Sequence, residues 1–385
     1  MTTATLPLSI HFPGKLVFSK GTLNNLAEEI LNFNLPKVFI LTIEPLLPKL
    51  QDLIHNLEGQ GKTVSVDTSI VQEPSFADFE NLLRAARQIN PDVVVGIGGG
   101  SVLDVAKLVA AQLDNTQTLA EIIGIGLLKG RSKKLICMPA TSGTGSEVSP
   151  NAILVDDADN QKKGIISPYL VPDVVYVDPL LTMSVPPQIT AATGLDALTH
   201  CLEAYTNKFA HPFIDMYAYE GMRLIAAHLV KAVQDGTDEE ARSQVAMGSL
   251  LGGFCLGPVN TAGVHALSYP LGSTFHLPHG LSNALLLPFV MEFNLPAAPR
   301  RYAEVAQALG CPPGHTDEET ARKGIDKIRH LIKACGIPAR LREVNIPESA
   351  IPGMAADALK ITRLLKNNPR PISLEDALNI YQAAY

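Results

Sequence analysis

Four side chains in the second half of the chain are of the types that hold a transition metal. Asp196 and His200 stand four positions apart, and His265 and His279 follow downstream around a Pro-Leu-Gly turn. Residues at i and i+4 share one face of a helix, so a carboxylate oxygen and an imidazole nitrogen can converge on one ion. One carboxylate and three imidazoles suit Fe²⁺ and Zn²⁺ equally well, and the divalent affinity order alone favours Zn²⁺.

A purely structural interpretation of Asp196 and His200 is a capping or ion-pair role within their helix, which also contains Glu203. The rest of this helix is small and apolar. Burying a carboxylate and an imidazole there without an ion would cost several kcal/mol, so a metal site is the better account. His276 shares a loop with His279, where it would contact either the ligands or the substrate.

The first half of the chain alternates short apolar segments with helical patterns. Four segments rich in β-branched residues predict strands at residues 37–42, 63–66, 92–97 and 135–138. Strands interleaved with helices imply a parallel, twisted sheet that is covered on both faces. The polar stretch from Asp156 to Lys163 predicts only a turn.

Beyond Pro187 the pattern becomes helical, with long helices predicted near residues 191–205, 212–235 and 239–255. A length of 385 residues exceeds what one hydrophobic core usually serves. We therefore expect two domains. Residues 1–183 would form an α/β dinucleotide-binding domain, and residues 184–385 an all-α metal-binding and catalytic domain.

A run of three glycines follows the strand predicted at residues 92–97. Backbone without Cβ atoms can approach a diphosphate closely, and the free N–H groups of a helix start attract the anion. A tight turn that needs small residues is the structural alternative. Asp104 faces either the cofactor or Lys107, one helical turn away. We predict a pyrophosphate cradle formed by Gly98, Gly99, Gly100 and Ser101.

A second segment, Pro139-Ala-Thr-Ser-Gly-Thr-Gly-Ser-Glu147, places four hydroxyls and two glycines directly after a predicted strand. Hydroxyls and bared amides suit a phosphate, a ribose or a nicotinamide carboxamide. Such clusters are usually only loops, but open α/β sheets bind ligands at the ends of their parallel strands. The candidate cofactor contacts here are Thr141, Ser142, Thr144 and Ser146.

Four ordered motifs together resemble the iron-containing (group III) alcohol dehydrogenase family. They are Gly98-Gly-Gly-Ser-Val-Leu-Asp104, the segment from Pro139 to Glu147, Gly194-Leu-Asp-Ala-Leu-Thr-His-Cys-Leu-Glu-Ala-Tyr205, and His265 to Gly272 with Pro278-His-Gly280. The resemblance implies a dehydroquinate synthase-like two-domain architecture, with an α/β domain, a helical domain and a divalent metal in the cleft between them. It also implies a homodimer, and it puts metal-ligand positions on Asp196, His200, His265 and His279.

The resemblance bears on the metal and the cofactor as well. Family members hold Fe²⁺ in many cases and Zn²⁺ in others, and we expect iron. Lys162 matches a position near the cofactor, although a solvated loop lysine is the alternative. Where members that prefer NAD tend to hold an aspartate, this chain has Ile43 and Glu44, so NAD and NADP both remain candidates.

Tyr269 marks a second departure from the family pattern. Many members carry a histidine four residues after the third ligand, and Tyr269 occupies that position here. A phenol can form hydrogen bonds and pass a proton, but it is a poorer base than an imidazole at neutral pH.

The expected function is that of a metal-dependent alcohol dehydrogenase or aldehyde reductase. The metal would act as a Lewis acid on the substrate hydroxyl while hydride passes to NAD or NADP. An oxo-acid reductase of the maleylacetate reductase type is the nearest alternative, and it needs an anion-binding group. A dehydroquinate synthase-like lyase would demand a strongly basic pocket, and a non-catalytic dinucleotide sensor would not need four ligands.

Composition limits the partners. A net charge of −7 with 18% charged residues argues against a nucleic-acid-binding surface, which needs clustered Lys and Arg. Five cysteines without a CxxC pair suit free thiols in a reducing compartment. Residues 1–5 show no signal-peptide pattern, and no apolar run reaches about 18 residues. We expect a cytoplasmic enzyme with a small-molecule substrate and no membrane partner.

Overall fold

The computed structural model describes residues 7–385, so the N-terminal residues 1–5 considered above lie outside it. Two compact units make up the fold. The α/β unit comprises residues 11–141 and 146–182. The helical unit comprises residues 183–385, the short segment 142–145 and the described residues up to Ile10.

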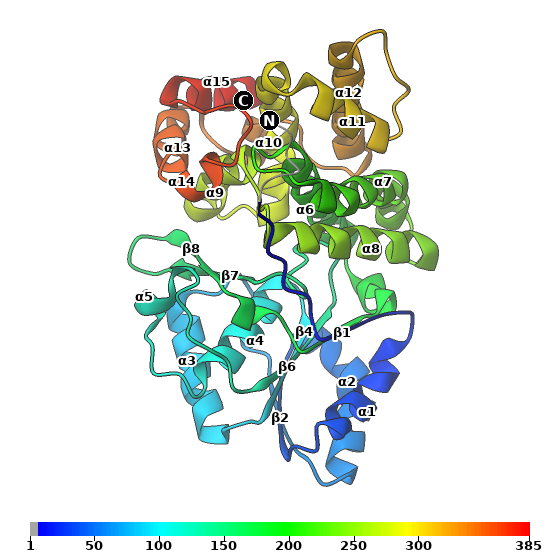
Figure 1. Cartoon of the computed structure of the whole chain (residues 1–385), viewed down its shortest axis with the longest axis vertical. Helices are drawn as coiled ribbons and strands as arrows, with labels where there is room; N and C mark the ends of the chain where they lie inside the picture. The colour runs from blue at the N-terminus through cyan, green and yellow to red at the C-terminus, as the bar shows by residue number, and fades with distance from the viewer. Residues whose placement is uncertain (1–6) are drawn as a thin grey trace. The chain divides into compact units, whose positions relative to one another are not determined.

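A six-stranded parallel sheet forms the centre of the α/β unit, in the order β1-β9-β6-β4-β2-β3 (Figure 1). Four of its strands confirm the segments predicted from the sequence, whereas β1 and β9 were not predicted. The bounds are β1 Lys15–Phe18, β2 Lys37–Leu41, β3 Thr63–Asp67, β4 Val93–Gly98, β6 Lys134–Pro139 and β9 Val174–Val177.

Alternate residues of the central strands pack against different helices, as the pleat of a strand requires. In β2, Val38 and Ile40 share a core with the helices α1 and α2, whereas Phe39 and Leu41 share one with α3 and α4. Figure 1 shows these two pairs of helices on opposite sides of β2. Both faces are therefore covered, which explains why β4 is buried along its whole length. The helices are α1 Leu26–Asn32, α2 Leu47–Gly59, α3 Phe76–Ile89 and α4 Gly100–Gln112.

A second, three-stranded sheet pairs β5 (Gly124–Ile125), β8 (Gln161–Ile166) and β7 (Asn151–Asp156), and the short helix α5 (Leu119–Ile122) precedes it. Strands β7 and β8 form an antiparallel hairpin. The prediction of a simple turn from Asp156 to Lys163 is therefore wrong at its second end, because β8 begins at Gln161.

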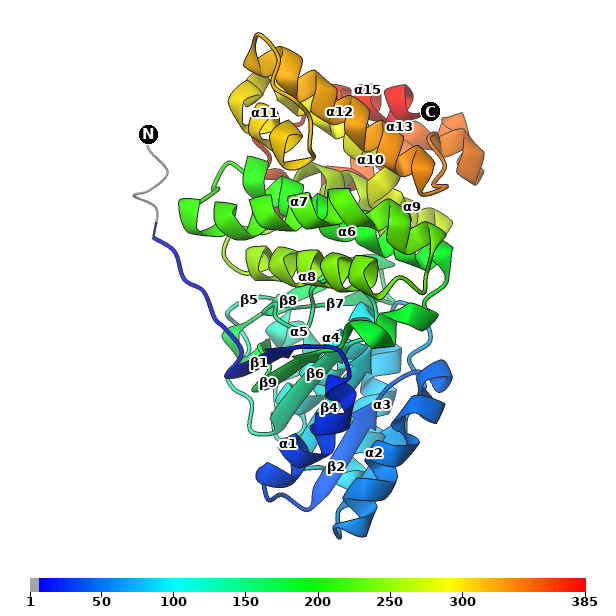
Figure 2. The same cartoon turned by 90° about the vertical axis from the view of Figure 1, so that its right-hand side faces the viewer.

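The helical unit contains the helices α6 to α15, of which α6, α7 and α8 correspond to the three predicted helices (Figure 2). One large apolar cluster joins these helices except α14, whose Leu364 packs against Ala266 and Tyr269 of α9. No helix within residues 7–385 has the length and apolarity needed to cross a membrane. The bounds are α6 Pro187–Thr206, α7 Pro212–Gln234, α8 Glu239–Leu256, α9 Gly263–Phe275, α10 His279–Asn294, α11 Pro299–Ala308, α12 Asp317–Ala334, α13 Ile351–Ala358, α14 Thr362–Leu365 and α15 Leu374–Ala384.

Candidate functional site

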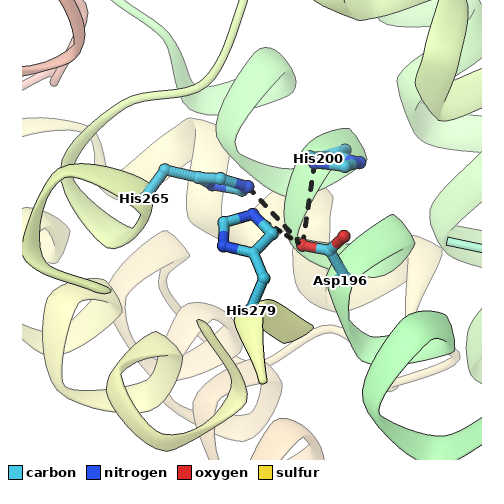
Figure 3. Close-up of side chains that lie close together, drawn as sticks. All are labelled: Asp196, His200, His265 and His279. Atoms are coloured by element: carbon cyan, nitrogen blue, oxygen red, sulfur yellow. Dashed lines mark ion pairs between the residues drawn. The ribbon is translucent and has the colours of Figure 1, made fainter. Parts of the chain in front are cut away.

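The four predicted metal ligands lie together in the helical unit (Figure 3). Oδ1 of Asp196 lies 3.7 Å from Nε2 of His200 and 3.6 Å from Nε2 of both His265 and His279. One ligand atom from each residue lies within 4.8 Å of the others. Four atoms about 2.1 Å from a central ion are about 3.4 Å apart in a tetrahedron, so the spacing fits a single transition-metal ion.

Three helices bring these side chains together. Asp196 and His200 occupy successive turns of α6, while His265 lies in the first turn of α9 and His279 is the first residue of α10. The start of α10 approaches α6 closely. A Cβ atom at Gly280 would lie only 2.2 Å from the carbonyl oxygen of Ala192, so a side chain at this position would push α10 and His279 away from α6.

Burial and charge favour a cation among the ligand atoms. Burial acts to raise the pKa of Asp196, but His200, His279 and His265 outweigh it and hold that pKa well below its ordinary value. At His200, burial lowers the pKa and favours the neutral imidazole, which is the ligating form. Burial also acts to lower the pKa of His265, yet Glu203 and Asp196 raise it to about 9. An ionised carboxylate and neutral imidazoles can hold a divalent cation, and binding of the cation would release the Nε2 proton of His265.

Glu203 is a buried member of the site whose role the sequence analysis did not assign. Its Oε2 lies 2.6 Å from Nδ1 of His265, and its Oε1 accepts the backbone N–H of Val264 at 2.6 Å. A carboxylate at Nδ1 holds the proton there and leaves the Nε2 lone pair free for a metal. Glu203 lies seven residues after Asp196, two turns along the same face of α6, and this spacing could have identified it.

Asn283 is the second residue that the sequence analysis missed. It follows His279 by one turn of α10, and its side-chain nitrogen donates to Oδ1 of Asp196 at 2.7 Å. The i to i+4 spacing from a predicted ligand was the available signal. An asparagine offers no charge, however, and therefore did not stand out among the residues of the chain.

Tyr269 and His276 differ in their relation to the cluster. The ring of Tyr269 lies one turn beyond His265 on α9, nearly buried, with its centroid 6.1 Å from that of the His279 ring. His276 is exposed at the end of α9, where its backbone has a φ of 55°. Among the described residues, the metal-binding group contains the four predicted ligands and does not include His276.

The glycine-rich turn leads from β4 into α4 as the sequence predicted. Strand β4 ends at Gly98 and α4 begins at Gly100, so Ser101 lies in its first turn. A Cβ atom at Gly98 would lie 2.8 Å from that of Val102, which explains why a larger residue is not accommodated. No side chain caps this helix start among the described residues, so its N–H groups are available to an anion.

Asp104 and Ser146, two predicted cofactor contacts, bind each other. The Ser146 hydroxyl donates to Asp104, whose other carboxylate oxygen accepts the N–H of Ile153 at 2.9 Å. The fully buried Lys107 lies 3.2 Å from Asp104, and its ammonium also donates to the Ser146 carbonyl at 2.9 Å. These bonds hold the loop after β6 against α4.

Of the other hydroxyl residues, Thr141 belongs to the α/β unit, while Ser142 and Thr144 lie in the segment 142–145 of the helical unit. Gly145 fixes this segment against α8. Its φ is +61°, and a Cβ atom there would lie 2.3 Å from the Cα of Gly253. The short loop thus has a backbone that only glycine accommodates.

Three further predicted contacts lie at strand ends or on strands of the α/β unit. Ile43 and Glu44 follow β2, where Ile43 is half-buried and Glu44 is exposed. Lys162 lies on β8, its side chain is only 6% exposed, and its ammonium pairs with Glu73. The alternative of a solvated loop lysine is therefore wrong.

A glycine-rich helix start and a buried carboxylate–imidazole cluster in one chain are typical of metal-dependent dehydrogenases. The family model for iron-containing alcohol dehydrogenase matches residues 13–179, and the C-terminal model of the Fe-containing alcohol dehydrogenase family matches residues 190–385. Long-chain-alcohol dehydrogenase 1 of Geobacillus thermodenitrificans (strain NG80-2) is 38% identical over 383 residues, covering 98% of this chain and 96% of the relative. The chain belongs to the iron-containing alcohol dehydrogenase family.

Solved structures agree with this assignment. The crystal structure of a 1,3-propanediol oxidoreductase superposes with a TM-score of 0.94 at 32% identity, covering 99% of this chain and 100% of that one. Sulfoacetaldehyde reductase from Bifidobacterium kashiwanohense, solved in complex with NAD⁺, gives a TM-score of 0.88 at 28% identity and covers 98% and 99% of the two chains. The predicted fold class, and the prediction of an NAD(P)-dependent alcohol and aldehyde oxidoreductase, are confirmed.

Proposed function

We propose that Asp196, His200, His265 and His279 hold the catalytic metal of an alcohol dehydrogenase that acts on a small alcohol or aldehyde. The observation that carries this proposal is the convergence of three imidazole nitrogens within 3.7 Å of one carboxylate oxygen. The ion is Fe²⁺, with Zn²⁺ as the alternative. The chemistry supplied by the two bound groups is Lewis-acid activation of the substrate oxygen and hydride exchange at the nicotinamide.

The chain's own residues prepare the site for this reaction. Glu203 holds the proton of His265 on Nδ1 and so orients Nε2 toward the other ligands. Tyr269 lies beside His279 and can exchange a proton with the substrate hydroxyl through its phenol. Residues 184–385 would therefore form the catalytic domain. His276, exposed at the end of α9, is proposed to contribute at most to substrate entry.

Residues 1–183 are proposed to bind the dinucleotide, with its diphosphate at the start of α4. Ile43 and Glu44 would flank the adenosine ribose, and Lys162 would lie near the cofactor. Asp104 and Ser146 would act by holding the loop after β6 in place, since they already bind each other. Both NAD and NADP remain candidates. The expected direct contacts are Gly98, Gly99, Gly100, Ser101, Thr141, Ser142 and Thr144.

Relatives indicate the range of substrates for which the site should be tested. Their names include a long-chain alcohol dehydrogenase, a 1,3-propanediol dehydrogenase and a sulfoacetaldehyde reductase. We further propose a homodimer in a reducing, cytoplasmic compartment, where five free thiols are stable.

The test combines removal of the metal with a single ligand variant. Chelation should abolish turnover, restoring Fe²⁺ or Zn²⁺ should recover it, and dinucleotide affinity measured by calorimetry should change by less than about threefold. His265→Ala should lose both the ion and turnover, whereas His330→Ala, an exposed histidine of the same unit, should lose neither. Full activity in His265→Ala, or in protein that contains no bound metal, would show that the ligand assignment is wrong.

A further inference from the structure

The side chain of Asn283 contacts three of the four proposed ligands at once. Its Nδ2 atom lies 2.7 Å from Oδ1 of Asp196, 3.1 Å from Nε2 of His265 and 3.3 Å from Nε2 of His279. The residue is completely buried. Its amide nitrogen therefore lies against the same atoms that would surround the metal.

The other end of this amide has a different environment. Oδ1 of Asn283 is buried and has no hydrogen-bond partner. A buried carbonyl oxygen without a hydrogen-bond partner is destabilising. A half-turn about the last side-chain torsion exchanges the nitrogen and the oxygen, and this torsion has two nearly equivalent wells. In either orientation, one of the two amide atoms has no hydrogen-bond partner. The charge held among the ligands therefore decides whether the nitrogen or the oxygen faces them.

A cation reverses the preference of the amide. The N–H groups suit the carboxylate oxygen of Asp196, but they are repelled by a positive ion held among the ligand atoms. A carbonyl oxygen is attracted by that ion and is a known ligand of divalent metals. We propose that Asn283 is a fifth protein donor of the metal site, whose carboxamide oxygen faces the bound cation. The inference rests on the ligand set proposed above.

Two substitutions at Asn283 test the donor role. Asn283→Leu keeps the branched shape of the side chain and removes the oxygen, so metal affinity should fall by about 10–100-fold in a competition with a coloured chelator. Asn283→Asp keeps an oxygen and adds a charge, so its affinity should equal or exceed that of the unaltered protein. Loss of affinity in both variants would overturn the proposal, since an oxygen donor would then be irrelevant.

The visible spectrum of the cobalt-substituted protein reports the number of ligands directly. Loss of one donor should raise the extinction of the Co²⁺ bands in Asn283→Leu, whereas Asn283→Asp should keep the weaker bands of the unaltered site. This readout does not respond to a change in folding stability alone. An unchanged spectrum in Asn283→Leu would contradict the proposal even if the variant is less stable.

Asn294→Leu is the matched control. Asn294 is a buried asparagine at the end of the same helix, and its amide pairs with Asn368 at 2.9 and 2.7 Å, away from the ligands. This variant should lose stability while keeping metal affinity and the cobalt spectrum. If the unaltered protein binds no metal, the ligand set itself is wrong. If it binds metal and His265→Ala does not, a normal Asn283→Leu refutes only the role of Asn283.

Discussion

Two buried clusters of charged side chains, one in each unit, compensate their buried charges in different ways. In the α/β unit, the Lys107 ammonium has Asp104 and backbone carbonyls as partners, and Asp104 accepts further bonds from Ser146 and Ile153. In the helical unit, a carboxylate oxygen faces three imidazole nitrogens, each of which can bind a metal once it carries no proton. Charges that satisfy one another stabilise a fold, whereas converging acceptors require a cation from outside.

Whether the buried polar groups already have partners within the chain distinguishes a structural cluster from a ligand-binding site better than residue type does. Asp104 and Ser146 have the chemistry of cofactor contacts, and the sequence analysis predicted that role. In the structure their polar atoms already have partners within the chain. Asp196 has the same carboxylate as Asp104, but its surroundings leave the ligand atoms directed at a common point (Figure 3).

The largest expected effect is that of Asp196→Asn. Removing the charge should eject the metal and lower kcat/KM by about a thousandfold or more, because Lewis-acid activation contributes several kcal/mol. Turnover and metal content are measured together, the latter by elemental analysis. The control is Asp326→Asn on the exposed face of α12, which should keep both. If the Asp196→Asn enzyme is active and contains metal, the two clusters would not differ in their need for a cation.

Lys107→Met should lower the stability of the fold and leave metal binding intact, which is the opposite of the result expected for Asp196→Asn. Removing the buried ammonium leaves Asp104 and the Ser146 carbonyl without their partner, so the free energy of unfolding should fall by about 3–5 kcal/mol. Urea unfolding measures this loss. Metal affinity of the folded fraction should stay normal. A variant as stable as the unaltered protein would show that the contacts of Lys107 with Asp104 and Ser146 do not stabilise the fold.

Glu203→Gln tests whether the Glu203 carboxylate controls which nitrogen of the ligand His265 carries the proton. A glutamine can still accept the N–H of Val264, but its amide would donate to Nδ1 of His265 and favour a proton on Nε2. Metal affinity should therefore fall by about 10–100-fold. Thr206→Val, a buried hydroxyl on the same helix, serves as the control for packing. Equal affinity in Glu203→Gln would exclude control of the tautomer by Glu203.

The smallest effect concerns Glu147, a buried carboxyl near Lys107. Burial raises its pKa to about 7, although Lys107 partly opposes the shift. Since the folded state holds this proton more tightly than the unfolded chain, stability falls as the pH rises from about 4.5 to 7 and is level above that range. Glu147→Gln should abolish this fall in stability, because glutamine does not titrate in this range. Urea titrations at pH 5 and 8 test this, with the exposed Glu80→Gln as the control.

Much of the fold could be predicted because it depends on local patterns. The β-branched segments identified β2, β3, β4 and β6, and the helical periodicity identified α6, α7 and α8. The strands β1 and β9 were overlooked, although β9 carries the same apolar signal as the predicted segments and β1, like β3, has only two exposed residues. The strand β8 begins with polar residues and only its last two residues are β-branched, which is why Lys162 was assigned to a turn.

The sequence by itself determined the pairing of Asp196 with His200, because helix geometry places residues four apart on one face. It also determined the glycine turn before α4, since no side chain fits at Gly98. Only the tertiary structure decided that His265 and His279 join this pair, that Glu203 and Asn283 support them, and that Asp104 binds Ser146 as well as Lys107. Local spacing follows from the backbone of one helix, whereas convergence depends on how closely separate helices pack, as the approach of Gly280 to α6 illustrates.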